Sequence, residues 1–337
     1  VAAVARREGQ QPVRLRLRGL ALPGTPPHGV DLGPLDLSVR RGEIVGIAGV
    51  AGEGQQELMA ALIGERLAPR AEMVEIDGHP AGRLGPKARR QAGAAFVPED
   101  RIGHAAVATM TLAENVLLAH HRAEGLAPRG WIARGPLRAW AERIRETFDV
   151  RARGASSAAS TLSGGNLQKF VVGREILRKP GVLAVNQPTW GVDAGAARTI
   201  RQALIDLAAG GAAVLVISQD LDELFAIADR IAVIHRGRLS TPEPTSSLDA
   251  ARIGMLMGGA EPGALRPEPG DGDAALRGEA PAQDPPLRLE GGDPVESQVD
   301  GAEGAIPVHD RQHRQSSDPL AFEGFQVNDE LMSAAPA

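Results

Sequence analysis

The feature that most constrains the fold is a glycine-rich loop between an apolar segment and a helical segment. Ile44–Ala48 predicts a buried strand, and Gln55–Ile63 predicts a helix. Between them, Gly49–Gln56 has the spacing of the phosphate-binding pattern G-x-x-x-x-G-K-[ST]. Gln55 stands in place of the phosphate-binding lysine, and Gln56 replaces the hydroxyl group that would hold Mg²⁺. The backbone of a phosphate loop is therefore present without its ionic side chains.

Composition limits the class of protein and divides the chain by charge. The 337 residues contain no cysteine, which excludes disulfides and thiolate metal sites and fits a reducing compartment. No apolar run reaches the roughly 18–20 residues of a membrane-spanning helix, and the start lacks a signal-peptide pattern, which predicts a soluble protein. Residues 260–337 hold 16 acidic and 5 basic residues, a net charge of −11, against −5 for the whole chain. We predict that this Pro- and Gly-rich tail is disordered.

Apolar segments and helical patterns alternate through most of the chain. Short apolar strands are predicted at 94–98, 182–185, 213–217 and 231–234, with amphipathic helices between them. This alternation predicts an α/β fold with a mostly parallel sheet covered on both faces. Val13–Arg40 alternates with period two and has turn signals at Gly33-Pro34 and Arg41-Gly42, which predicts an antiparallel β part at the N-terminus. From about 105 to 165 there are helical patterns and no strand, which predicts an inserted helical subdomain.

Further motifs follow the glycine loop in a fixed order. Phe96–Arg101 precedes the helical segment, and Leu162–Lys169, with the sequence LSGGNLQK, opens a helix. Val182–Asp193 runs from a strand into a turn, and Ile217–Asp220 follows another strand. In this order and spacing, residues 12–240 resemble an ABC transporter ATP-binding cassette. The resemblance implies a P-loop NTPase-like fold over 13–258, an N-terminal extension over 1–12 and a tail over 259–337.

The resemblance assigns roles to individual residues, and many of these depart from the family pattern. Gln187 and Gln219 occupy the places of the catalytic glutamate and the switch histidine, so hydrolysis at this site is not expected. Asn186 replaces the metal-binding aspartate, and no metal ligand is assigned. Asp193 corresponds to the D-loop. The implied nucleotide-binding positions are Gly49, Gly52, Gly54, Gln55, Gln56, Glu99 and Asn186. The signature element, which in the family acts on the nucleotide of the opposite cassette, is kept as Leu162, Ser163, Gly164, Gly165 and Asn166.

The resemblance also implies cofactors and partners. The motif variants, with Gln187 before Pro188-Thr189, resemble the second, degenerate cassette of tandem proteins for nucleoside or simple-sugar import. The implied cofactors are ATP, bound weakly at this site and shared at a partner's site, and Mg²⁺ held through that partner. The implied partners are a second cassette with an intact P-loop, transmembrane permease subunits and, indirectly, an extracytoplasmic solute-binding lipoprotein. No nucleic acid is expected. The implied location is cytoplasmic, peripheral on the inner face of the plasma membrane.

Two functions remain open on the sequence alone. One is a transport ATPase subunit whose ATP is hydrolysed mainly by a partner cassette, and the other is a non-catalytic scaffold derived from such a cassette. Four side chains carry smaller predictions. Lys169 is expected to be a solvated helix residue, and His120-His121 a surface pair. Trp190 is expected either near a cassette dimer seam or in the core.

Overall fold

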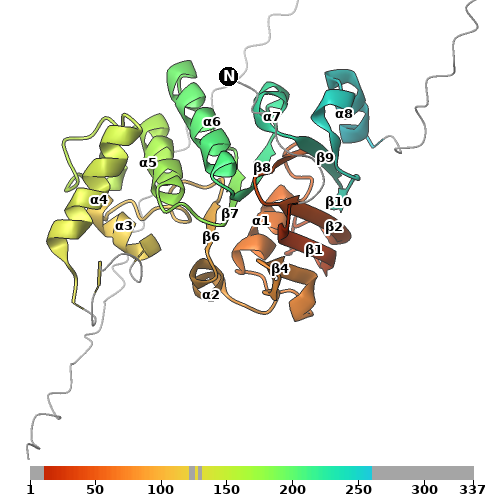
Figure 1. The fold of residues 1–337 in the computed structure, drawn as a ribbon, viewed down its shortest axis with the longest axis horizontal. Helices are drawn as coiled ribbons and strands as arrows, with labels where there is room; N and C mark the ends of the chain where they lie inside the picture. The colour runs from red at the N-terminus through yellow and green to blue at the C-terminus, as the bar shows by residue number, and fades with distance from the viewer. Residues whose placement is uncertain (1–10, 121–125, 128–130, 260–337) are drawn as a thin grey trace, which may run out of the picture. The chain divides into compact units, whose positions relative to one another are not determined.

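The computed structural model describes residues 11–120, 126–127 and 131–259, which form two β-sheets with helices around them (Figure 1). In β1, Leu15 and Leu17 are buried and Arg16 between them is only half-buried, as expected for a sheet with one face on a core. The N-terminal sheet is antiparallel and has the order β2-β1-β4-β5, with β1 at Val13–Leu22, β2 at Leu32–Arg40, β4 at Val74–Ile76 and β5 at His79–Pro80.

The second sheet is mostly parallel and has the order β10-β9-β3-β8-β7-β6, with β11 paired to β9. The register places Ala48 opposite Ser218 and Asn186 opposite Ile217, so the carboxyl ends of β3, β8 and β7 lie side by side. The α/β fold predicted from the sequence is thus confirmed. The strands are β3 (Ile44–Ala48), β6 (Ala94–Val97), β7 (Val182–Asn186), β8 (Ala213–Ser218), β9 (Arg230–His235), β10 (Arg238–Leu239) and β11 (Glu243–Pro244).

Buried side chains alternate between two cores on the two faces of the parallel sheet. In β6, Ala95 and Val97 belong to a core shared with α3 to α8, whereas Ala94 and Phe96 belong to a core shared with α1 and the antiparallel sheet. Figure 1 shows α1 between the two sheets. No described helix is both long and apolar enough to cross a membrane. The helices outside the 105–163 segment are α1 (Gln55–Ile63), α2 (Pro86–Gln91), α5 (Gly164–Ile176), α6 (Ala194–Ala209), α7 (Leu221–Ile227) and α8 (Ala250–Met257).

Helices fill the segment between β6 and α5. Its described residues form α3 (Leu112–His120), α4 (Arg134–Thr147) and the short 3₁₀ helix η3 (Ala159–Thr161), with isolated bridges but no strand. Short 3₁₀ turns also occur at Ala71–Met73 and Thr245–Ser247. Figure 1 shows α3 and α4 beside α5. On α4, the buried residues are Leu137, Ala141 and Ile144, at the spacing of one helix face.

Two predictions about local structure are wrong. Gly33-Pro34 lies inside β2 rather than in a turn. Proline is tolerated there because β2 is an edge strand, and Gly33 has a φ of 94° where the pairing with β1 shifts register. His120 is buried rather than on a surface, because α4 covers it: its ring packs edge-on against Trp140 with centroids 5.9 Å apart. The predicted tail, most of residues 1–12 and His121 lie outside the described residues.

Candidate functional site

The glycine loop joins β3 to α1, and three of its glycines are required by its geometry. Gly52 and Gly54 have φ values of 85° and 112°, a left-handed backbone conformation that other residues rarely adopt. Gly49 is required by a close approach instead. A Cβ there would lie 2.6 Å from Cγ2 of Ile234 and 2.7 Å from Nε2 of Gln55. The start of the loop is therefore packed tightly against the side chain of Gln55.

The side chain of Gln55 folds back into this loop. Its Nε2 donates to the carbonyl of Val50 at 2.7 Å, and its Oε1 accepts from the N–H of Glu53 at 3.1 Å. One partner requires a donor and the other an acceptor, which fixes the orientation of the amide. Gln55 is buried, whereas Gln56 is exposed. The side chain of Gln55, which stands at the position of the phosphate-binding lysine, is thus hydrogen-bonded to the backbone of its own loop.

A cavity of about 40 Å³ lies where β3, β7 and β8 end. Ligands of open α/β sheets bind at this edge, outside the carboxyl ends of the strands. Gly49 and Gly54 do not line the cavity; they shape the loop. Most of the other positions singled out from the sequence come together in its wall: Gly52, Gln55, Gln56, Glu99, Asn186, Gln187 and Gln219.

The wall of this cavity carries several amides and a single charged side chain. Among its described lining residues, Glu99 is the only charged one, and its Oε2 accepts from Nδ2 of Asn186 at 3.3 Å. Asn186 is buried, and its Oδ1 has no hydrogen-bond partner within the described part of the chain. Residues 11–120, 126–127 and 131–259 contain no group of three His, Asp or Glu side chains placed to hold a metal ion. The cavity therefore offers hydrogen bonds, but no cation for a phosphate group.

A buried carboxyl group lies behind this wall. Ser218, which lines the cavity, donates from Oγ to Oε2 of Glu223 at 2.8 Å. The other carboxylate oxygen of Glu223 is buried and has no hydrogen-bond partner in the described structure. Burial raises the pKa of Glu223, against the lowering effect of the hydrogen bond from Ser218. Next to it, the N–H of Gln187 donates to the carbonyl of Ile217 at 2.8 Å, and this bond ties β7 to β8 at the site.

The LSGG element opens α5 and remains accessible. Ser163 is the N-cap of α5, and its Oγ accepts from the backbone N–H of Asn166 at 3.4 Å and from Nδ2 of the same residue at 2.9 Å. Asn166 in turn accepts from the N–H of Arg151 at 2.8 Å. Ser163 and Gly164 are exposed, and Leu162 and Gly165 are half-buried. Ser163 thus satisfies the backbone N–H of Asn166, while the exposed start of the helix remains open to an approaching anion.

Arg101 and Gln168 connect this element to the turn after β7, a link that sequence reasoning missed. Arg101 donates from Nε to Oε1 of Gln168 at 3.0 Å and from Nη2 to the carbonyl of Trp190. Gln168 donates to the carbonyls of Gln187 and Pro188, both at 3.0 Å. A signal was present in the sequence, because Gln168 stands one helical turn after Gly164 and therefore on the same face of α5.

Two side chains of the motif segments differ from prediction. Lys169 is buried rather than solvated, because its ammonium group donates to the backbone carbonyl of Asp149 and lies 3.4 Å from the carboxylate of the same residue. Trp190 is 65% exposed, so the alternative of core packing is wrong. Asp193 caps α6 by accepting from the N–H of Ala196 at 2.9 Å, and this bond lowers its pKa.

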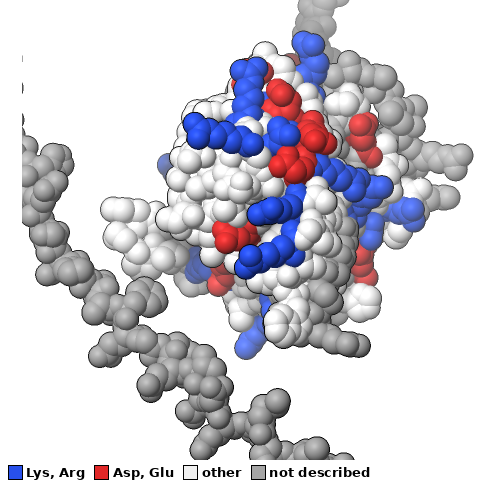
Figure 2. All heavy atoms as spheres, turned by 90° about the vertical axis from the view of Figure 1, so that its left-hand side faces the viewer, with Lys and Arg blue, Asp and Glu red and all other residues white. Residues whose placement is uncertain are grey.

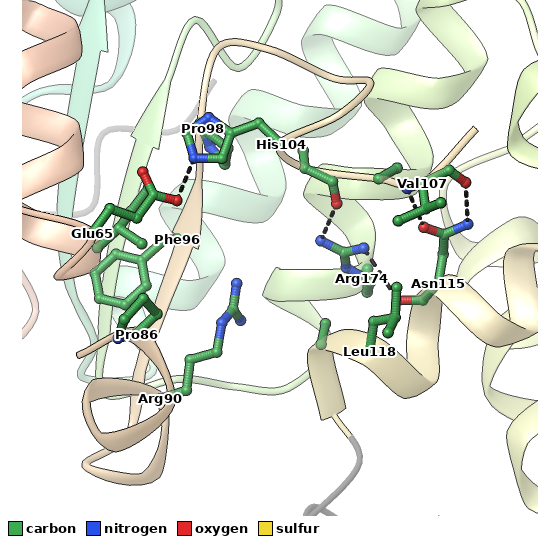
Figure 3. Close-up of a pocket in the computed structure, with 14 residues that line it drawn as sticks. Glu65, Pro86, Arg90, Phe96, Pro98, His104, Val107, Asn115, Leu118 and Arg174 are labelled. Atoms are coloured by element: carbon green, nitrogen blue, oxygen red, sulfur yellow. Dashed lines mark hydrogen bonds and ion pairs between the residues drawn. The ribbon is translucent and has the colours of Figure 1, made fainter. Parts of the chain in front are cut away.

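A second cavity, of about 210 Å³, lies between α2, β6 and α3 (Figure 3). It contains the side chains of Arg90 and Arg174, and Asn115 at its side is bonded to both backbone groups of Val107. Arg90 and Arg174 approach the buried carboxylate of Glu175 at 2.7 and 2.9 Å. Their charges are therefore paired inside the fold.

The face that carries α3 and α4 shows Lys and Arg intermixed with Asp and Glu (Figure 2). On α4, for example, Arg145 lies 2.5 Å from Glu142 and 3.9 Å from Glu146. Pairs that stay in contact with solvent in this way contribute little to stability. This face presents charges of both signs and no continuous field of one sign.

Comparison with known proteins identifies the fold. Residues 32–190 match the ABC transporter family. The ATP-binding subunit of an ABC transporter has a similar fold, with a TM-score of 0.56 and 24% identity over 73% of this chain and 95% of that one. A dimeric ATP-binding cassette in a post-hydrolysis state, bound to ADP and phosphate, gives a TM-score of 0.59 and 22% identity over 68% and 98%. The chain thus has the fold of an ABC ATPase cassette.

Beyond the fold, the chain is similar in sequence to import proteins. It is 38% identical to a glucose import ATP-binding protein of Haloferax volcanii, over 75% of this chain and 46% of that protein. It is 40% identical to a nucleoside import ATP-binding protein of Lactococcus lactis, over 67% and 44%, and 37% identical to a guanosine import ATP-binding protein of Bacillus subtilis, also over 67% and 44%. The chain thus spans about half the length of the curated relatives it matches.

Proposed function

We propose that this chain is one nucleotide-binding half of an ABC importer for nucleosides or simple sugars. In this proposal it completes the ATP site of a partner cassette, and its own site does not hydrolyse ATP. The solute class comes from the relatives, which are import proteins for glucose, nucleosides and guanosine. We assign the cassette to residues 13–258, with a helical subdomain at about 105–165. The observation that carries the proposal is the contrast between the amide-lined cavity at Gln55 and the exposed LSGG element at Ser163.

The argument for an inactive own site is electrostatic. A charge-assisted hydrogen bond contributes roughly 1.5–3 kcal/mol, so the loss of lysine and Mg²⁺ contacts weakens triphosphate binding by about 3–6 kcal/mol. This is roughly two to four decades in affinity. The lining does not fit Mg²⁺, because its one carboxylate, Glu99, is already bonded to Asn186. Phosphoryl transfer depends on such electrostatic groups. Gln187 and Gln219 therefore leave the site without a group to polarise water or to sense the terminal phosphate.

The argument for a donated element rests on the start of α5. This helix is 13 residues long, and its first N–H groups and positive dipole end favour an anion. Ser163 and Gly164 lie there exposed, as the approach of a second cassette requires. We propose that Leu162–Asn166 contacts the nucleotide of the partner cassette and that Asp193 belongs to the same interface. The exposed Trp190 then lies at this seam.

The remaining components follow from this assignment and are proposals as well. ATP binds weakly at the chain's own site and is shared at the partner's site, where Mg²⁺ is held. The partner is a cassette with an intact P-loop. Both cassettes work beneath transmembrane permease subunits, on the cytoplasmic face of the plasma membrane, with a solute-binding lipoprotein on the other side.

Mg²⁺-dependent ATP hydrolysis tests the proposal. The purified chain is expected to release no phosphate above background, whereas the assembled importer hydrolyses ATP. Gly164→Ala is expected to abolish that turnover, because it adds a methyl group to the exposed surface that in this proposal contacts the partner's nucleotide. Gly135→Ala on α4, where a Cβ has nothing within 4 Å, is the matched control. If Gln55→Ala lowers turnover as much as Gly164→Ala does, the proposal that this chain only completes the partner's site is wrong.

A non-catalytic scaffold is the second candidate, and the bonds of Gln55 within the loop favour it. A scaffold binds no nucleotide, with or without the partner cassette, and does not stimulate the partner's turnover. Nucleotide titration of the chain alone and of the assembled pair therefore separates the two functions.

A further inference from the structure

The glycine loop holds one of its own side chains at the place where such loops hold phosphate. Backbone N–H groups of a phosphate loop point into its concave side and cradle the phosphate oxygens. Here the N–H of Glu53 is bonded to Oε1 of Gln55 at 3.1 Å, and Nε2 of the same amide is bonded to the carbonyl of Val50 at 2.7 Å. We propose that Gln55 is an internal plug, whose amide oxygen replaces a phosphate oxygen and keeps the loop closed. This inference rests on the proposed function, because it states what weakens phosphate binding at the chain's own site.

Contacts on both sides of the loop make the closed arrangement specific. On the inner side, Gly49 passes so close to Nε2 of Gln55 that a Cβ would be 2.7 Å away. On the outer side, the carbonyl of Glu53 accepts from the N–H of Gly237 at 2.8 Å. The carboxylate of Glu53 also accepts from the N–H of Arg236 and lies 3.2 Å from Nδ1 of His235. The residue that offers its N–H to the plug is thereby tied to the turn between β9 and β10.

The two explanations of weak phosphate binding, a plug and a missing charge, predict different affinities when the side chain of Gln55 is removed. A lysine carries only donors, so it satisfies the carbonyl of Val50 and leaves the N–H of Glu53 free for phosphate. Glutamine satisfies both groups. If the site is weak only because the charge is absent, the removal of the Gln55 side chain brings no gain. If Gln55 is a plug, its removal frees the loop N–H and increases the affinity for phosphate.

The first test is calorimetric titration of the chain with inorganic pyrophosphate and with ADP. Gln55→Ala is expected to bind pyrophosphate about fivefold more tightly than the wild type, the equivalent of one net hydrogen bond. Gln55→Lys is expected to bind more tightly still, because it adds a cation to the opened loop. Gln202→Ala makes the same change on α6, where Gln202 pairs with Asp206, and is expected to bind like the wild type. Equal or weaker binding by Gln55→Ala than by the wild type overturns the plug.

The second test reads the loop without a ligand. In the wild type, the amide proton of Glu53 is expected to be protected from hydrogen exchange, and Gln55→Ala is expected to speed its exchange roughly fivefold. An unchanged rate in Gln55→Ala contradicts the plug even where phosphate binding is too weak to measure. Thermal melting of each variant confirms that it is folded.

The two proposals fail in different ways. Phosphate release by the wild-type chain alone contradicts the proposed function. Unaltered pyrophosphate binding and unaltered exchange at Glu53 in Gln55→Ala contradict only the plug, and the chain then remains a cassette whose site is weak through missing charge.

Discussion

At the residue scale, Glu223 keeps a carboxyl group buried directly behind the wall of the candidate site. One of its oxygens accepts from Ser218 and the other has no partner in the described structure, while burial raises its pKa. We expect Glu223→Gln to raise the free energy of unfolding at neutral pH by about 1 kcal/mol, because the amide keeps the bond to Ser218 and removes a poorly solvated charge. Chemical denaturation measures this change.

The pH dependence of Glu223 has a definite sign. A carboxyl group with a raised folded pKa contributes stability below its unfolded pKa and loses it as pH rises through the folded pKa. The gain in Glu223→Gln is therefore expected to shrink as the pH is lowered. The adjacent Asp222 is exposed, so Asp222→Asn serves as the control and is expected to change stability by less than about 0.5 kcal/mol. A loss of stability in Glu223→Gln at neutral pH contradicts the argument.

The sequence predicted the members of the candidate site better than their contacts. Asn186, Gln187 and Gln219 follow apolar strands, and the carboxyl ends of neighbouring parallel strands meet at one sheet edge. Their convergence therefore follows from strand order. The bonds of Gln55 to Val50 and Glu53 do not follow from spacing, because an exposed glutamine at this position fits the same motif.

At the element scale, α4 and α5 approach so closely that glycine is needed between them. A Cβ on Gly173 of α5 would lie 2.5 Å from Cδ2 of Phe148, the buried residue that follows α4. We expect Gly173→Ala to lower the free energy of unfolding by about 1–3 kcal/mol, as overpacked cores do. The cost of this clash thus exceeds the roughly 1 kcal/mol by which alanine is favoured over glycine in a helix. Urea denaturation measures the change.

A double-mutant cycle tests the cause of that loss. Phe148→Leu removes the ring that meets the new methyl group, so the double variant is expected to lose less stability than the sum of the single variants. Gly254→Ala on α8, where a Cβ has nothing within 4 Å, is the control and is expected to be neutral or stabilising. Strict additivity in the cycle shows that the ring is not the obstacle.

The helices and strands that the sequence predicted lie within about two residues of their observed bounds because their signals are local, whereas α2 and α8 were not predicted. Ile44–Ala48 and Gln55–Ile63 lie where the apolar pattern placed them. Gly33-Pro34 was misplaced because the signal for a turn is the same as that for an irregular edge strand. Only the pairing with β1 distinguishes the two.

At the scale of the whole molecule, one buried carboxylate joins elements that are far apart in the chain. Glu175 on α5 is fully buried and lies 2.7 Å from Arg90 of α2, 2.9 Å from its neighbour Arg174, and 3.7 Å from Arg178. His120 of α3 is 4.0 Å away, beyond hydrogen-bonding distance. Arg90 is 85 residues from Glu175, so no local pattern reveals this cluster. It joins α5 to α2.

The cluster predicts the acid stability of the fold. Burial alone would raise the pKa of Glu175, but Arg90 and Arg174 outweigh it and hold the pKa well below 4.5. Burial also lowers the pKa of His120 below 6.5, partly offset by Glu175. Both groups therefore bind protons more readily in the unfolded chain. Melting temperatures are expected to fall as the pH drops below 6.5 and to fall more steeply below 4.5, the ordinary values of these two groups.

Removal of the carboxylate charge separates this effect from general acid denaturation. Glu175→Gln leaves the surrounding arginines without their buried counter-ion, so we expect it to lower the free energy of unfolding at neutral pH by about 3–5 kcal/mol. The variant has no carboxylate at this position that acid could protonate. Its stability should therefore decline less than that of the wild type below pH 4.5. Glu72→Gln, which breaks an exposed pair with Arg70 at 3.4 Å, should keep both the wild-type stability and the wild-type acid profile. If Glu175→Gln instead behaves like Glu72→Gln, the cluster does not hold α2 to α5.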